Sequence, residues 1–197
     1  MLLYFLAILL GYLLGSISFS YLIGRITMNI DIREHGSGNA GATNTLRVLG
    51  KKAAIFVLLG DVLKGVVAVW IGYLLTHSEE GLALAGLASI VGHNWPVYFG
   101  FRGGKGVATT IGVMISIVPT ASLYAGIVAI LILLITRMVS VFSLLFQTIL
   151  PIAIWLSGAP SVYFWSSIVT AVLSYWRHRS NIVRILEGKE SRIGKSK

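Results

Sequence analysis

The stretch that decides the number of helices is residues 106–136, GVATTIGVMISIVPTASLYAGIVAILILLIT. Its 31 residues carry no charge, whereas one helix needs roughly 20 apolar residues to cross a bilayer. Pro119 interrupts the stretch, and a proline removes a backbone donor and clashes with the preceding helical turn. We therefore expect two helices here, of about 13 and 17 residues, the first short for a membrane at about 1.5 Å per residue.

The rest of the chain also has the composition of a membrane protein. Of its 197 residues, 56% are hydrophobic and 12% are charged, and the mean hydropathy is +0.85; soluble domains carry more charge. The other apolar stretches are residues 2–24, 53–76, 81–101, 138–157 and 159–176. The first lacks a basic start and a cleavage site, so it is expected to be a retained helix and not a signal peptide. The absence of cysteine excludes disulfides, thiolate metal sites and a cysteine nucleophile.

The distribution of charge predicts the topology. The formal net charge is +9, but the basic residues cluster at the ends of apolar stretches, which favours membrane topology and anionic ligands over nucleic acid. Seven helices with the N-terminus outside place all these cations on the cytoplasmic side, as the positive-inside rule requires. Six would put Arg137 and the basic tail from Arg177 on the opposite side. We predict an all-α, polytopic membrane protein with seven transmembrane helices, a cytoplasmic C-terminus and a single domain over residues 1–197, ending in a solvated, disordered segment at residues 195–197.

The first polar segment is GSGNAGATNTLR, residues 36–47. Glycines allow positive φ and let main-chain N–H groups approach a ligand, which suits an anion-binding loop. Asn44 could cap a short helix, and the guanidinium of Arg47 is a planar fork of donors suited to phosphate. A flexible loop without a ligand is the alternative interpretation.

The second polar segment lies in GHNWPVYFGFRGGKGVAT, residues 92–109. It is not a nucleotide P-loop, because Phe99 stands at the first glycine position of that motif and Gly106 at its hydroxyl position. What remains is a set of glycine N–H groups beside Lys105, at the expected start of a helix, where the partial positive charge favours anions. Alternatively, Lys105 only marks the cytoplasmic side and His93 is a packing residue.

The third segment is RHRSNIVRILEGKE, residues 177–190. If the last helix continues beyond the membrane, His178, Asn181 and Ile185 lie near one face, as do Arg177, Asn181 and Arg184. The ordinary pKa of a histidine would allow His178 to act as an acid or a base near neutrality.

Two pairs of polar residues within or next to the apolar stretches are candidates for a structural or functional role. Asp61 and Lys64 are three positions apart, and because isolated charges in a membrane are costly they should pair with each other or face a wet cavity; a structural ion pair is favoured. Ser140 and Ser143 begin the apolar stretch after Arg137, where a hydroxyl can bond a ligand or cap the helix.

Some chemical machinery is missing from the sequence. No histidine begins an H-x-x-x-x-D pair, the usual dyad of glycerolipid acyltransferases, and no His, Asp and Glu residues have metal-ligand spacing. We therefore expect no metal and no cofactor, and a reaction that needs neither a strong base nor a covalent nucleophile.

Together the three segments resemble the signature motifs of the bacterial acyl-phosphate:glycerol-3-phosphate acyltransferases, the PlsY family. The resemblance covers essentially the whole chain, with Arg102 and Ile185 in place of the more usual lysine and leucine. It implies an enzyme of the bacterial inner membrane whose active site faces the cytoplasm. Acyl phosphate and glycerol 3-phosphate would give lysophosphatidic acid and inorganic phosphate.

The resemblance also implies roles for individual residues. Lys105, its neighbouring glycines, Ser37 and Ser143 would hold the acyl phosphate, and Arg47, His178 and Asn181 would hold glycerol 3-phosphate. The further substrate-binding candidates are Gly36, Gly38, Asn39, Asn44, His93, Gly103, Gly104, Gly106, Thr109, Ser140, Arg177 and Arg184. The proton of the acceptor hydroxyl would pass to His178 or to a substrate phosphate.

Two other functional classes remain open. A transporter of a phosphorylated metabolite would also need anion sites, but transporters usually have repeated halves and midplane sites, and no repeat is evident here. A non-catalytic scaffold would not need three such segments. As an enzyme, the chain is expected to be a monomer among membrane lipids. Its functional partners would be the enzyme that forms acyl phosphate and the next acyltransferase.

Overall fold

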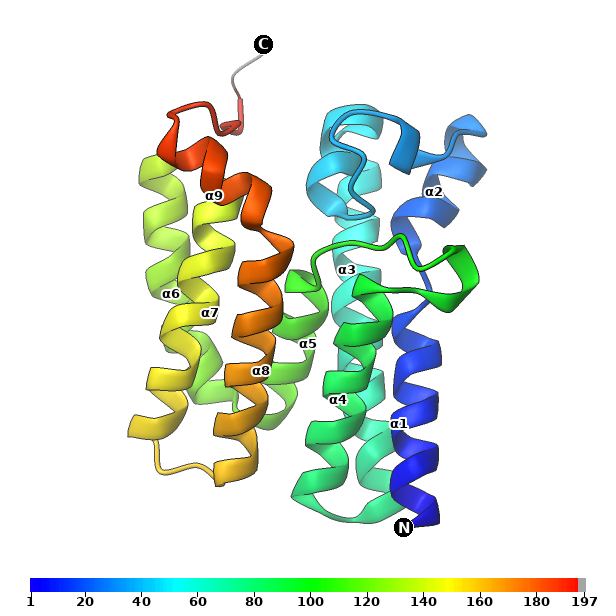
Figure 1. Cartoon of the computed structure of the whole chain (residues 1–197), viewed down its shortest axis with the longest axis vertical. Coiled ribbons are helices and arrows are strands. Elements are labelled where there is room, and N and C mark those ends of the chain that lie inside the picture. The colour runs from blue at the N-terminus through cyan, green and yellow to red at the C-terminus, as the bar shows by residue number, and fades with distance from the viewer. Residues whose placement is uncertain (195–197) are drawn as a thin grey trace. The chain divides into compact units, whose positions relative to one another are not determined.

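The computed structural model describes residues 1–194, and the regular elements in that range are helices. Residues 195–197, predicted to form a disordered end, lie outside the described range. The α-helices are α1 (Leu2–Gly15), α2 (Phe19–Met28), α3 (Ala42–Thr76), α4 (Glu79–Asn94), α5 (Val107–Ile117), α6 (Pro119–Thr136), α7 (Val139–Leu156), α8 (Ser161–Arg177) and α9 (Arg179–Leu186) (Figure 1). Two 3₁₀ helices cover Ile32–Glu34 and Val97–Phe99.

The helices form two compact units that divide between Ile117 and Val118. Unit 1 contains α1 to α5, and unit 2 contains α6 to α9. The predicted helix break at Pro119 is confirmed, since α5 ends at Ile117 and α6 begins with Pro119 as its first residue. A proline at this position loses no helical hydrogen bond, because the first N–H groups of a helix have no intrahelical acceptor.

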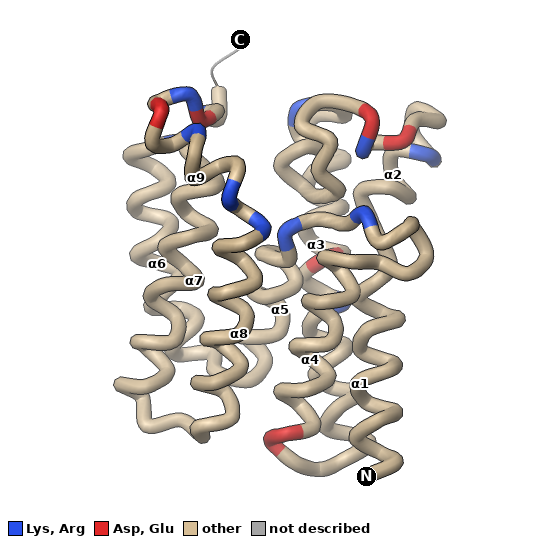
Figure 2. The backbone as a smooth tube through the Cα atoms, in the orientation of Figure 1, with Lys and Arg blue, Asp and Glu red and all other residues tan. Residues whose placement is uncertain are grey.

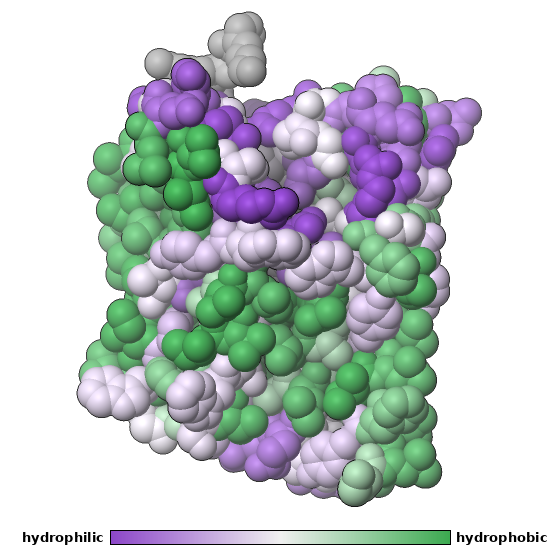
Figure 3. All heavy atoms as spheres, in the orientation of Figure 1, coloured by the Kyte–Doolittle hydropathy of each residue, from purple (hydrophilic) through white to green (hydrophobic). Residues whose placement is uncertain are grey.

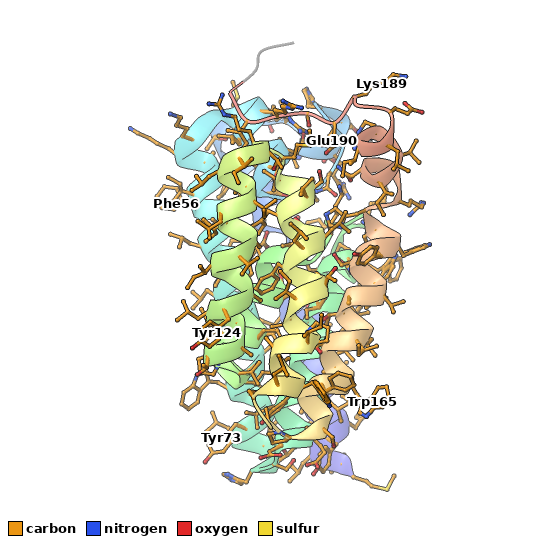
Figure 4. All side chains as sticks on the ribbon, turned by 90° about the vertical axis from the view of Figure 1, so that its left-hand side faces the viewer. Phe56, Tyr73, Tyr124, Trp165, Lys189 and Glu190 are labelled. Atoms are coloured by element: carbon orange, nitrogen blue, oxygen red, sulfur yellow. The ribbon has the colours of Figure 1, made fainter. Side chains whose placement is uncertain are left out.

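Four segments of the described chain are long and apolar enough to cross a membrane: residues 2–28, α3, α6 and α7. Helix α5 is apolar but has only 11 residues. Phe56, Tyr124 and Trp165 point away from their helices (Figure 4) and are 66%, 63% and 63% exposed. Such surfaces suit lipid. The count of seven crossings and the orientation of the termini stay predictions.

Two expected helices are interrupted. The first apolar stretch is not helical between Gly15 and Phe19. The carbonyl of Ile17, which lies in this interruption, therefore accepts no hydrogen bond within a helix. The last membrane helix does not continue past the apolar stretch, because α8 ends at Arg177 and the chain turns at His178 before α9. The condition considered from the sequence, that the last helix continues unbroken beyond the membrane, is therefore not met.

Glycines bring α1 and α4 into close contact. A side chain at Gly11 or Gly15 would collide with the backbone of α4, and one at Gly92 would collide with the carbonyl of Tyr12. Small residues at such an interface let two membrane helices approach closely. This contact fixes the end of α4, from which the second polar segment departs.

A buried ion pair joins three parts of unit 1. Lys64 Nζ lies 2.9 Å from Asp61 Oδ1, and both side chains are at most 2% exposed. The same ammonium donates to the carbonyl of Ile17 at 2.8 Å, and His93 Nδ1 lies 3.4 Å from Asp61 Oδ1. The predicted ion pair is thus confirmed. It connects α3 to the interruption after α1 and to the end of α4.

Replacing Lys64 with Met is expected to lower the free energy of unfolding by about 3–5 kcal/mol, because the Asp61 carboxylate would stay buried without its cation. The double variant Asp61→Asn, Lys64→Met removes both charges and should recover most of this loss. Unfolding in detergent, followed by circular dichroism, measures both. Lys52→Met, exposed on the same helix, is the matched control and should change stability by less than about 0.5 kcal/mol. A double variant no more stable than Lys64→Met would contradict this role.

Candidate active site

Charged residues gather at one end of each unit. Most Lys and Arg residues of unit 1 lie at the end that carries the loops after α2 and α4, and the charged residues of unit 2 lie at the end that carries α9 (Figure 2). Figure 3 shows hydrophilic residues over these ends and mainly hydrophobic residues over the helices. The three polar segments occupy these ends.

Asn44 holds the first polar segment in shape. Its buried Oδ1 accepts from the main-chain N–H of Ser37 at 2.8 Å, and its Nδ2 donates to the carbonyls of Ile32 and His35 at 3.0 Å each. The prediction that Asn44 caps the helix was wrong, because Gly41 is the N-cap and Asn44 lies inside the first turn. The short helix itself is confirmed, since Gly50 interrupts α3 with a φ of 83°. The amide of Asn44 therefore stabilises the preceding loop instead of capping the helix.

An ion pair next to this loop connects the first segment with the second. The guanidinium of Arg33 donates to both carboxylate oxygens of Asp31, at 2.7 to 3.2 Å, and this lowers the pKa of Asp31 to about 2. The carboxylate in turn raises the pKa of Arg33. Arg33 Nη1 also donates to the carbonyl of Phe99 at 2.7 Å. Arg33 thus connects the loop after α2 with the loop after α4.

The second segment packs closely against the first. The N–H of Gly104 donates to the carbonyl of His93 at 3.1 Å. A side chain at Gly104 would collide with the imidazole of His93 and with the carbonyl of Ala40 in the first segment, so glycine is needed for this contact. Lys105 follows directly and lies two residues before α5. The structure therefore brings the two glycine-containing segments together, with a lysine at the start of a helix.

Glu190 organises the third segment. This carboxylate is 8% exposed and accepts hydrogen bonds from Ser140 Oγ at 2.8 Å, Asn181 Nδ2 at 2.7 Å and Arg184 Nε at 2.8 Å. Burial alone would raise the pKa of Glu190, but these three bonds lower it on balance. Three of the predicted site residues, Ser140, Asn181 and Arg184, thus contact one carboxylate.

His178 and Ser143 are buried in unit 2 as well. Nδ1 of His178 lies 2.8 Å from the carbonyl of Ser174. A carbonyl oxygen can only accept, so this contact places a proton on Nδ1. The hydroxyl of Ser143 donates to the carbonyl of Val139 at 2.8 Å, a bond within its own helix.

The other predicted site residues differ in how far they are exposed. Arg47 is exposed, Lys105 and Arg177 are half-buried, and Thr109 is buried in the first turn of α5. The role of Glu190 was not predicted from the sequence. The sequence indicates only that a carboxylate beside a basic, membrane-adjacent segment needs cationic or hydroxyl partners if it is buried, and it does not indicate which ones.

Comparison with known proteins places this geometry in a family. Residues 5–188 match the model of the family described as glycerol-3-phosphate acyltransferase. The glycerol-3-phosphate acyltransferase of Halalkalibacterium halodurans is 55% identical, with 95% of this chain and 94% of that protein covered. The protein of the same name from Shouchella clausii is 54% identical, with 95% of each covered.

Two solved structures have the same fold. The crystal structure of PlsY, an integral membrane glycerol 3-phosphate acyltransferase, in its glycerol 3-phosphate form aligns with a TM-score of 0.92 and 39% identity, covering 97% of this chain and 96% of that one. Its lysophosphatidic acid form aligns with a TM-score of 0.89 and 38% identity, covering 97% and 95%.

Replacing Glu190 with Gln is expected to lower the free energy of unfolding by about 2 kcal/mol, because it weakens three hydrogen bonds to a buried charge. The difference from wild type should persist above the ordinary glutamate pKa of 4.5 and diminish as the pH falls below it, because the unfolded chain takes up a proton there while the native carboxylate, whose pKa is lowered, stays ionised. Thermal unfolding between pH 4 and pH 7 measures this. Glu187→Gln, an exposed partner of Lys189, is the control and should have little effect; equal effects of the two variants would contradict the role of Glu190.

Proposed function

Since this chain belongs to the glycerol-3-phosphate acyltransferase family, we propose that it transfers an acyl group from acyl phosphate to the sn-1 hydroxyl of glycerol 3-phosphate. The products are lysophosphatidic acid and inorganic phosphate. The observation that carries this proposal is the close contact of Gly104 with Ala40 and His93, which sets Lys105 and main-chain N–H groups at the start of α5. Such a site suits a phosphate.

The chemistry of the donor fits the residues present. An acyl phosphate is a mixed anhydride with a good leaving group, so the enzyme must mainly position two anions and stabilise developing charge. The hydroxyl oxygen of glycerol 3-phosphate forms a bond with the carbonyl carbon of the donor. The carbon–oxygen bond to the phosphate breaks, and the electron pair leaves with the phosphate.

We assign the residues as the sequence suggests. Lys105 and the glycines beside it, with Ser37 and Ser143, bind the acyl phosphate and polarise its carbonyl. Arg47, His178 and Asn181 bind glycerol 3-phosphate. The contact of Asn181 with Glu190 supports this role, because it fixes the orientation of the amide.

The proton of the attacking hydroxyl goes to the leaving phosphate. The second pKa of a phosphate, near 6, makes it a competent base at neutral pH. His178 then acts as a donor from Nε2, and its contact with the carbonyl of Ser174 supports this orientation. Two bound phosphates would also favour the charged imidazole.

The cellular setting is inferred from the distribution of charge and from the substrates of the proposed reaction. We infer that the chain is a monomer in the bacterial inner membrane, with its active site facing the cytoplasm. The concentration of basic residues at the polar segments supports this orientation. An enzyme that forms acyl phosphate would supply its donor, and the next acyltransferase would consume its product.

Lys105→Ala is expected to lower kcat/KM at least about 100-fold, because it removes a cation from the reacting phosphate. The assay measures inorganic phosphate released by the purified protein from acyl phosphate and glycerol 3-phosphate. Lys52→Ala is the control, since Lys52 is exposed on α3, and it should retain full activity. Wild-type turnover by Lys105→Ala would contradict the assignment, as would equal activity with acyl-CoA or acyl-carrier protein as donor.

His178→Gln separates the two routes for the proton. If the leaving phosphate is the base, the variant should keep appreciable kcat and show a raised KM for glycerol 3-phosphate, since only a binding contact is lost. Steady-state kinetics at several pH values measure both constants. His77→Gln, exposed in the turn after α3, serves as the control. A loss confined to kcat would identify His178 as the base.

A further inference from the structure

Asn94, the last residue of α4, has no hydrogen-bond partner within the described residues. Its side chain is 0% exposed, and neither Nδ2 nor Oδ1 is bonded. Asn44, which is 1% exposed, uses both ends of its amide in three bonds. A native protein pairs nearly all its buried polar groups, so the amide of Asn94 is expected to meet a partner that the chain itself does not supply.

The amide lies against the turn that starts α5. Its Oδ1 would be 2.9 Å from a side-chain carbon added at Gly106, and Ile90, one turn earlier on α4, touches the same position. Gly106 has a φ of 78° and directly precedes the first residue of α5. The side chain of Asn94 is therefore aimed at the N-terminus of an 11-residue helix.

That helix start also has donors of its own. The first N–H groups of an α-helix have no intrahelical acceptor and carry a partial positive charge. Thr109, in the first turn of α5, is fully buried, and its Oγ1 has no hydrogen-bond partner in the described part of the chain. Two buried side chains without a hydrogen bond thus lie on α4 and α5, the two helices that the segment with Lys105 connects.

We propose that Asn94 is a further binding residue of the phosphate site, donating Nδ2–H to an oxygen of the phosphate held at the start of α5. This role rests on the proposed function and extends the site from the loop to the end of α4. Rotation of the amide by 180° exchanges its donor and acceptor ends, so the donor can face the turn. A buried water molecule in the same place is the competing occupant.

The phosphate and the buried water molecule can be distinguished with the variant Asn94→Leu, which removes both polar atoms and keeps a similar volume. If the partner is the ligand, the protein without phosphate has an unsatisfied amide, and the variant should be at least as stable as wild type. Its affinity for phosphate should fall about tenfold or more, the effect of one hydrogen bond to a charged group. If the partner is structural water, the variant should lose stability and keep its affinity.

The experiment measures the Tm of the full chain in detergent against the concentration of inorganic phosphate, at constant ionic strength. Phosphate should raise the Tm of wild type. Asn94→Leu should require a phosphate concentration at least about tenfold higher for the same rise in Tm. Asn94→Asp, which puts a carboxylate next to the anion, covers the case in which the leucine variant does not fold, and should show an even weaker response. A wild-type phosphate response in whichever variant folds would overturn the role of Asn94.

Lys105→Ala in the same titration separates this inference from the proposed function. If Lys105→Ala loses the phosphate response while Asn94→Leu keeps it, the phosphate site stands and the role of Asn94 is wrong. If phosphate does not raise the Tm of wild type, or Lys105→Ala responds as wild type does, the phosphate site itself is overturned.

Discussion

The ion pair between Asp61 and Lys64 is the interaction on which the arrangement of unit 1 depends. A charge in an apolar helix must find its partners inside the protein, and this pair finds the carbonyl of Ile17 and the ring of His93. The carbonyl of His93 then holds the N–H of Gly104. Two contacts therefore connect the ion pair to the loop that carries Lys105, so the pair contributes to the site without touching a substrate.

Buried polar side chains shape the other segments by the same principle. Asn44 organises the first loop, Arg33 joins it to the second through Phe99, and Glu190 collects donors from α7 and α9. Each forms several bonds because an unpaired polar group is costly in an apolar protein. The loops are thus held by hydrogen bonds to these side chains. A rigid set of donors is what anion binding requires, since it lowers the cost of ordering on binding.

This construction is consistent with a reaction whose donor is already activated. The described residues provide main-chain N–H groups, cations and oriented amides, which position phosphates and stabilise charge. Asn94 differs from the other buried amides, because its polar atoms have no partner in the described chain. Residues at binding sites often lower the stability of the free protein, as an unpaired buried amide would. The contrast between Asn44 and Asn94 separates an amide that maintains the fold from one that is available to a ligand.

The sequence by itself determined the helical class, the helix break at Pro119, the Asp61–Lys64 pair and the family. The family follows from the resemblance of the three polar segments, and the other three follow from local physics, namely apolar length, the missing donor of proline, and two charges one helical turn apart. Only the tertiary structure decided the roles of Asn44 and Glu190 and the break after Gly15. Ser140 and Glu190 are 50 residues apart, and the bonds of Asn44 depend on how a loop folds back over its helix. Spacing does not reveal such partners, because a polar side chain pairs with whichever group packing brings within reach.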